Sequence, residues 1–369
     1  MAAVQYLCAK LGMVSGRGLA GVLRHHYPRW VLYPAVFLLV VANTINAGAD
    51  IGAIAAAINL LVPIPIAWMI VPISLAIVAL QVWGSYKLIA GTFKWLCIAL
   101  FAYVGAGILA RPDVGEVLRS TVIPTVQFDA HFATTLVAIL GTTISPYLFF
   151  WQASQEVEEE IQLGRHSHWS RVGATDRELK YRAWDVNIGM FIAIVVMYFI
   201  MLATGATLHK AGQTSIQSAS DAAVALKPLA GDLAGVLLAI GLIGTGVLAV
   251  PILTGSAAYA VCEAAGWRYG LDEKPGRARQ FYAVIGVATV VGMGLDFLGI
   301  NPIDALFYTA VINGLLAPPL LVLIMLASNN KRIMGDRINN NWTNVAGWTA
   351  TAVMAGAAIV LVLTWGRGS

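Results

Sequence analysis

Nine long apolar segments restrict the fold of this chain more than any other feature. An α-helix needs about 20 apolar residues to cross a bilayer, and each segment is about that long or longer. Only 11% of the residues are charged, whereas a soluble domain carries roughly a quarter. The sequence therefore predicts an all-α polytopic membrane protein, with one domain over residues 1–369 embedded in a lipid bilayer. The predicted spans cover roughly residues 31–58, 63–83, 89–110, 131–153, 186–208, 233–262, 280–299, 302–327 and 346–365.

Basic residues are distributed unevenly between the connections. When alternate connections are counted from the segment 10–29 onward, one side holds 18 of the 23 lysines and arginines. Because such residues concentrate in cytoplasmic loops, that side is predicted to face the cytoplasm. The long connection 154–184 then lies in the cytoplasm, and the C-terminus lies outside.

Residues 1–14 form a shorter apolar segment that precedes a basic loop. This segment is too short to cross a bilayer, and it lacks the basic beginning of a signal peptide. We expect it to be the second half of a helix that begins upstream of Met1, or the result of a truncated gene.

The predicted span 131–153 is interrupted by polar residues and a proline, in the sequence GTTISPYLFFWQ. Pro146 removes one helical hydrogen bond, and the hydroxyls of Thr142, Thr143 and Ser145 precede it. Transporters use such breaks at mid-membrane, where freed carbonyl groups coordinate cations. The same pattern also fits a proline kink in which serine and threonine bond back to the helix. Both interpretations remain open from the pattern alone.

The span 31–58 carries Asn43, Asn46 and Asp50 at a spacing that places them on one helical face. An ionisable residue at membrane depth indicates function, so we expect this face to line an ion or proton pathway. The alternative is a polar stripe that only joins helices. Gly48 and Gly52 form a GxxxG pattern, which predicts close helix packing.

Two further polar groups allow both a functional and a structural interpretation. Asn313 lies near the middle of the span 302–327, just before Pro318 and Pro319. The segment SQEVEEEIQLGRHSHW combines four glutamates with two histidines. We favour a solvated helix end for this acidic segment over a metal-collecting cluster, because arginine and lysine follow closely.

Several segments, in the right order, resemble the Nramp (natural resistance-associated macrophage protein) family of divalent metal transporters. AKLGMVSGRGLAGVLRHHYPR resembles the end of the family's second helix and the loop after it. AINLLVPIP resembles the end of the third helix, and ASDAAVALKPLAGDLAGVLLAIGLIGTG the approach to the eighth. LASNNKRIMGDRINN resembles the loop after the tenth helix, and GTTISPYLFFWQ falls at the broken sixth helix.

This resemblance implies a LeuT-type inverted-repeat bundle. Residues 31–365 would then be helices three to eleven, about nine full transmembrane helices, and residues 1–14 the remnant of helix two. The family's first helix carries an Asp-Pro-Gly-Asn motif that binds metal, and no Asp-Pro-Gly occurs in this chain. The chain is therefore expected to be N-terminally truncated relative to the family.

The resemblance also implies a metal site at the break. Ser145 stands at the family's methionine position and Tyr147 at its histidine position, with the Thr142 carbonyl one turn earlier. A hydroxyl is a harder ligand than a thioether, so the chain resembles the divergent branch that includes magnesium carriers. Asp50 matches a family acidic position, but Ala47 replaces the aspartate on the family's proton route. We expect Thr142, Ser145, Tyr147 and Asn313 to bind the metal, Pro146 to break the helix, and Asp50, Asn46 and Asn43 to line the pathway.

The predicted function is transport of divalent cations, of the Mn²⁺/Fe²⁺ type or Mg²⁺, by alternating access in a bacterial-type inner membrane. The alternatives are an organic-solute carrier on the same fold and a non-transporting truncated remnant. No HExxH, GxSxG or P-loop occurs, so no enzyme is predicted. No cofactor beyond the transported ion and no nucleic-acid partner is expected. The sequence leaves the oligomeric state open, and a monomer satisfies the architecture.

Overall fold

The computed structural model describes residues 1–83, 101–123, 129–212, 216, 219–223, 231 and 234–364. All regular elements within these ranges are helices. Seven of them are long and apolar enough to cross a membrane, which confirms the predicted class of fold. These seven are Arg29–Leu61, Ile66–Trp83, Ala130–Gln162, Asp176–His209, Leu238–Ala265, Pro302–Ser328 and Asn341–Thr364.

The main helices are α3 (Arg29–Leu61), α4 (Ile66–Trp83), α8 (Ala130–Thr143), α9 (Pro146–Gln162), α11 (Asp176–Thr204), α14 (Ala234–Ala265), α15 (Arg279–Asp296), α16 (Pro302–Ser328) and α18 (Asn341–Thr364). The π-helical turn η1 (Gly205–His209) extends α11. The shorter helices are α1 (Ala2–Ser15), α2 (Leu19–His26), α6 (Ala102–Leu109), α7 (Val114–Val122), α10 (His168–Arg171), α12 (Ala219–Ala223) and α17 (Lys331–Met334).

Two of the nine predicted spans have no counterpart among these seven helices. The predicted span 89–110 lies mostly outside the described residues, and α6 covers only its last part. The predicted span 280–299 corresponds to α15, which ends at Asp296 after 18 residues.

The predicted connection 154–184 is wrong in its extent, because most of it is helical. The helix α9 continues nine residues beyond the predicted end of its span at residue 153, and α11 begins at Asp176 with a capping box between Thr175 and Glu178. The irregular part is residues 163–175, interrupted by α10. Hydropathy missed both ends, because these helical turns are polar.

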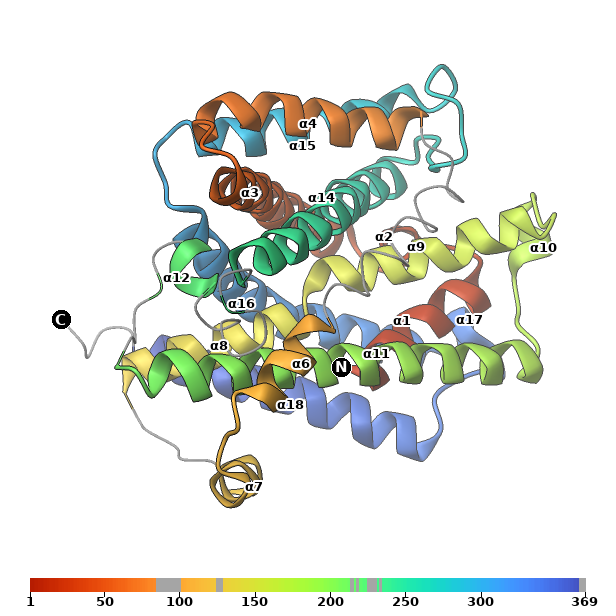
Figure 1. Ribbon diagram of the computed structural model, residues 1–369. Helices are drawn as coiled ribbons and strands as arrows, with labels where there is room; N and C mark the ends of the chain where they lie inside the picture. Colours follow the sequence, from red (N-terminus) through yellow and green to blue (C-terminus); the bar gives the residue numbers. More distant parts are fainter. Residues whose placement is uncertain are drawn as a thin grey trace.

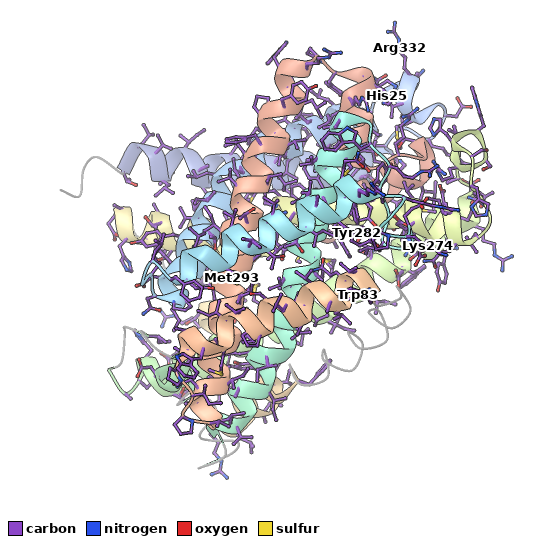
Figure 2. The ribbon with its side chains drawn as sticks, turned by 90° about the horizontal axis from the view of Figure 1, so that it is seen from above. His25, Trp83, Lys274, Tyr282, Met293 and Arg332 are labelled. Carbon is purple, nitrogen blue, oxygen red and sulfur yellow. The ribbon has the colours of Figure 1, made fainter. Side chains whose placement is uncertain are left out.

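The helices fall into two groups. Figure 1 shows α3, α4, α14 and α15 together in the upper part of the molecule, α1, α8, α11 and α18 in the lower part, and α9 between them. Seen from above, α15, with Tyr282 and Met293, runs beside α4, which ends at Trp83 (Figure 2). The helix α3 packs against α14, α15 and α16, so the face that carries Asp50 lies in the interior of the bundle.

The GxxxG pattern on α3 brings two helices into backbone contact, as predicted. A Cβ on Gly48 would collide with the carbonyl of Gly292 on α15, and a Cβ on Gly292 would lie 2.8 Å from the carbonyl oxygen of Thr44. Only glycine at both positions allows this approach.

Candidate functional site

The span Ala130–Gln162 is interrupted between α8 and α9. The helix α8 ends at Thr143, Ile144 and Ser145 leave the helical conformation, and Pro146 is the first residue of α9. Ser145 is buried, and its hydroxyl donates to the carbonyl oxygens of Gly141 (2.6 Å) and Thr142 (3.1 Å). The serine thus satisfies carbonyl groups that the break would otherwise leave without donors. The lone pairs of its oxygen remain available as acceptors.

Close contact with α16 positions the first half of the broken span. A Cβ on Gly141 would collide with the carbonyl of Ala310 and the amide of Gly314. A Cβ on Gly314 would lie 2.5 Å from the carbonyl oxygen of Val137. Asn313 adjoins Gly314, is 3% exposed, and its Oδ1 has no hydrogen-bond partner among the described residues.

The variant Gly141→Val is expected to lower the melting temperature, because overpacking costs about 1–3 kcal/mol. Thermal unfolding of the purified protein in detergent measures the effect. The control is Gly189→Val on α11, where an added Cβ meets nothing within 4 Å. Equal melting temperatures for the two variants would contradict the described contact between α8 and α16.

The second half of the break brings Tyr147 toward Asp50. The Tyr147 side chain packs against an apolar cluster to which Ala47 of α3 and Leu253 of α14 belong. The carbonyl oxygen of Tyr147 accepts from the Ser256 hydroxyl of α14 (2.9 Å), and the tyrosine side chain lies within electrostatic range of the Asp50 carboxylate. Two of the predicted site residues, Tyr147 and Asp50, therefore gather where α3, α9 and α14 meet.

The two asparagines on α3 contact different helices. The amide nitrogen of Asn43 donates to the carbonyl oxygen of Leu253 on α14 (3.0 Å), and its Oδ1 has no partner among the described residues. The Oδ1 of Asn46 accepts from the hydroxyl of Thr309 on α16 (3.0 Å). Both asparagines therefore join helices, as the structural interpretation predicted, and their role in a pathway stays a prediction.

A buried polar pair joins α4 to α14 and was not predicted from the sequence. The Thr254 hydroxyl is within 3.1 Å of Oε1 of Gln81, whose Nε2 has no partner in the described part of the chain. Gln81 is a polar residue in an apolar span, and Thr254 follows the mid-helix Pro251. Either signal could have marked the pair.

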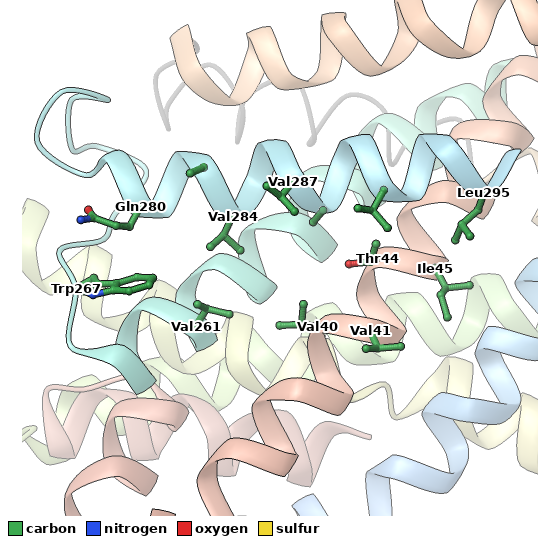
Figure 3. Close-up of a pocket in the computed structure, with 13 residues that line it drawn as sticks. Val40, Val41, Thr44, Ile45, Val261, Trp267, Gln280, Val284, Val287 and Leu295 are labelled. Carbon is green, nitrogen blue, oxygen red and sulfur yellow. The ribbon is translucent and has the colours of Figure 1, made fainter. Parts of the chain in front are cut away.

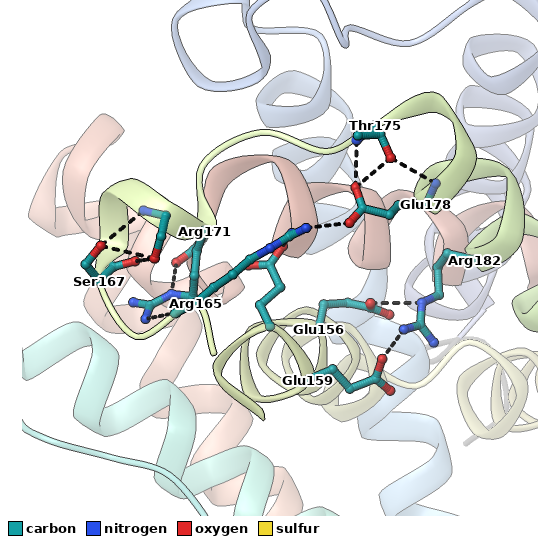
Figure 4. Close-up of polar contacts among 11 residues, drawn as sticks. Glu156, Glu159, Arg165, Ser167, Arg171, Thr175, Glu178 and Arg182 are labelled. Atoms are coloured by element: carbon teal, nitrogen blue, oxygen red, sulfur yellow. Dashed lines mark hydrogen bonds and ion pairs between the residues drawn. The ribbon is translucent and has the colours of Figure 1, made fainter. Parts of the chain in front are cut away.

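The prediction of a solvated acidic helix end is wrong. Glu156, Glu158 and Glu160 are at most 4% exposed. Arg182 of α11 pairs with Glu156 (2.9 Å) and with Glu159 (Figure 4). No group of three or more His, Cys, Asp or Glu side chains arranged to hold a metal occurs among the described residues. The acidic segment therefore fastens α9 to α11.

A cavity of about 610 Å³ between α3, α14 and α15 is distinct from the break (Figure 3). Valine, alanine, leucine and isoleucine form most of its wall, and Thr44, Trp267 and Gln280 supply the polar atoms. No carboxylate, thiol or imidazole is among its described lining residues. This chemistry suits an apolar molecule and not a metal ion.

Comparison with known proteins settles the family. The family model described as natural resistance-associated macrophage protein-like matches residues 1–364. The chain belongs to the Nramp family. The resemblance found in the separate sequence segments is thus confirmed over nearly the whole chain.

Relatives of this Nramp chain are named as transporters, not as enzymes. The divalent metal cation transporter MntH of Klebsiella pneumoniae strain 342 is 27% identical over 362 residues, covering 95% of this chain and 80% of that protein. A second Klebsiella pneumoniae strain has an MntH with the same identity and coverage.

Solved structures of the Eremococcus coleocola manganese transporter share the fold. The form in complex with an aromatic bis-isothiourea substituted compound superposes with a TM-score of 0.68 at 20% identity. The superposition covers 98% of this chain and 77% of that one. The helices of this chain are therefore arranged as in an Nramp, LeuT-type bundle.

Proposed function

We propose that this Nramp chain carries divalent metal cations across a membrane by alternating access. The observation that carries the proposal is the interrupted span at Ile144 and Ser145, in a chain of this family, with Tyr147 and Asp50 gathered beside the interruption. Broken helices at mid-membrane supply oxygen ligands for cations in transporters.

Each predicted site residue has a role in this proposal. The Thr142 carbonyl, the hydroxyls of Ser145 and Tyr147 and the Asn313 amide are the cation ligands. The Asp50 carboxylate supplies negative charge at membrane depth. Asn46 and Asn43 line the pathway and join α3 to its neighbours.

The ligand chemistry favours a hard cation. Every proposed ligand is an oxygen atom, and hard cations such as Mg²⁺ and Mn²⁺ prefer oxygen. The named relatives carry divalent metal cations or manganese. We therefore infer that Mg²⁺ and Mn²⁺ are both cargo of this chain, with less preference for softer metals than a thioether site would give.

The two helix groups suggest the moving parts. The helices α3, α4, α14 and α15 would be the static group, and the broken span would move against them (Figure 1). The distribution of basic residues supports a cytoplasmic position for α10 and the connection around it. An inner membrane of bacterial type, with a monomer as the working unit, fits this arrangement.

Uptake into proteoliposomes tests the proposal. The purified chain is expected to carry Mn²⁺ and Mg²⁺ down a concentration gradient into vesicles loaded with a fluorescent chelator. Protein-free vesicles give the background, and each metal should compete with the other. Uptake of an amino acid without any metal uptake would overturn the proposal.

A further inference from the structure

A second cavity, with a mostly apolar wall that includes one carboxylate, opens at the opposite end of α3 from the basic loops. Its volume is about 600 Å³, and it lies between α3, α4, α14 and the connection from α15 to α16. Ala53, Ala56 and Asn59 line it from α3, and Asp296 lines it from the last turn of α15. This cavity is separate from the apolar cavity of Figure 3.

Asp296 brings an unpaired carboxylate to this cavity. Its Oδ2 is buried and has no hydrogen-bond partner among the described residues. Within the same residues, none of the ion pairs involves Asp296. A carboxylate with one oxygen buried and no partner is costly, and a bound cation reduces that cost.

The backbone of α3 leaves room for this carboxylate. A Cβ on Gly52 would lie 2.7 Å from Oδ1 of Asp296 and 3.0 Å from Cγ of Pro302. Gly52 therefore has a different role from Gly48, which contacts the backbone of Gly292. Glycine at position 52 lets the carboxylate lie against α3.

A second oxygen is available on α3 itself. The amide nitrogen of Asn59 donates to the carbonyl oxygen of Ile64 (2.8 Å), which leaves the amide oxygen as an acceptor. The described residues that line the cavity include no Phe, Tyr or Trp. The cavity therefore lacks the aromatic faces that recognise organic cations.

We propose that this cavity binds a hydrated divalent cation, with Asp296 as its charged ligand and the Asn59 amide oxygen, about two turns along α3 from Gly52, as an acceptor for the water shell of the ion. A cavity much larger than a bare ion leaves room for water ligands, which Mg²⁺ retains when it binds proteins. The site is distinct from the helix break, and Asp296 belongs to neither α8 nor α9.

The position of the cavity suggests that the ion is captured there before transport, an extension that rests on the proposed function. One turn along α3 from Ala53 lies Asp50, and one turn along α16 from Leu306 lies Thr309, the partner of Asn46. A negative group at the mouth of a low-dielectric cleft raises the local concentration of cations.

Binding is tested by titrating the full chain in nanodiscs with Mn²⁺ alone and following free Mn²⁺ by electron paramagnetic resonance. A weak site, with a dissociation constant of about 10⁻⁴–10⁻³ M, is expected in the wild type and should be lost in Asp296→Asn. The control Asp304→Asn removes an exposed acid nearby and should bind Mn²⁺ as the wild type does. Unchanged binding by Asp296→Asn would overturn the site.

A measurement on the unaltered chain does not depend on whether the variant folds. Met293 lies one turn before Asp296 on α15, and Met334 lies elsewhere, on α17 (Figure 2 labels Met293). With methyl-labelled methionine, bound Mn²⁺ should broaden the Met293 resonance at concentrations that leave Met334 sharp. Equal broadening of both resonances contradicts a site at Asp296.

Transport kinetics of Asp296→Asn distinguish a failure of the capture site from a failure of the proposed transport function. Asp296→Asn is expected to raise the KM for Mn²⁺ uptake by about three- to tenfold with little change in kcat, since capture and not translocation is impaired. Binding at Asp296 in a chain that carries no metal would overturn the proposed function and leave the site standing. Metal uptake with an unaltered KM in Asp296→Asn would overturn the capture role.

Discussion

Asp50→Asn is expected to abolish most divalent cation uptake while the protein remains folded. At a separation of about 8 Å and an effective dielectric constant of about 20, a carboxylate and a divalent cation attract by about 4 kcal/mol. Solvent and counter-ions screen part of this attraction, so we expect the variant to lose at least about 2 kcal/mol of it. A loss of that size lowers uptake by more than about tenfold. Asparagine keeps the shape of the side chain, so packing between α3 and α14 should survive.

Three comparisons identify the cause of that loss. Asp50→Glu keeps the charge and should retain a substantial part of the uptake. Asp304→Asn removes an exposed carboxylate at the start of α16 and should transport normally. Melting temperatures should agree among all three variants. Wild-type uptake by Asp50→Asn would show that the charge on α3 has no part in transport.

Ser145→Met is expected to raise Mn²⁺ or Cd²⁺ uptake relative to Mg²⁺ by about tenfold, since a thioether binds softer metals than a hydroxyl does. The change is measured as a ratio of uptake rates in proteoliposomes that contain one variant each. A ratio cancels differences in protein insertion between preparations.

The serine hydroxyl also makes two hydrogen bonds, so its removal needs a separate control. Ser145→Ala deletes the bonds to the carbonyls of Gly141 and Thr142 without adding sulfur. We expect this variant to reduce all uptake but to keep the ratio near that of the wild type. If alanine and methionine give the same ratio, the residue at position 145 acts through the helix break and not as a ligand.

The sequence predicted the main features of the fold and the position of the break. The apolar runs marked the spans, and Pro146 with Ser145 marked a helix that the structure interrupts at Ile144 and Ser145. Both signals are local, because hydropathy and proline act within one segment of chain.

The features that the sequence analysis missed depend on partners far along the chain. The glutamates of α9 looked solvated, because the pattern around Glu156 does not show that Arg182 lies beside it. Asn43 and Asn46 share one helical face, but Asn43 bonds to α14 and Asn46 bonds to α16. Helix periodicity gives the direction of a side chain but not the identity of the neighbour that it meets.

The position expected to carry a proton-route aspartate illustrates the same limit. Ala47 is fully buried in an apolar cluster with Ile51 and Leu253. The exchange of aspartate for alanine is what the resemblance to the family implies. The structure adds that a carboxylate at this position would lie within an apolar cluster against which Tyr147 packs.

The interruption at Ile144 and Ser145 also separates two mechanical units. The helix α8 is held against the backbone of α16 through Gly141, whereas the carbonyl of Tyr147 on α9 accepts from Ser256 of α14 (2.9 Å). Each half of one membrane span thus contacts a different neighbour. Movement of those neighbours past each other would turn the torsion angles of Ile144 and Ser145, and would strain the two hydrogen bonds of the Ser145 hydroxyl.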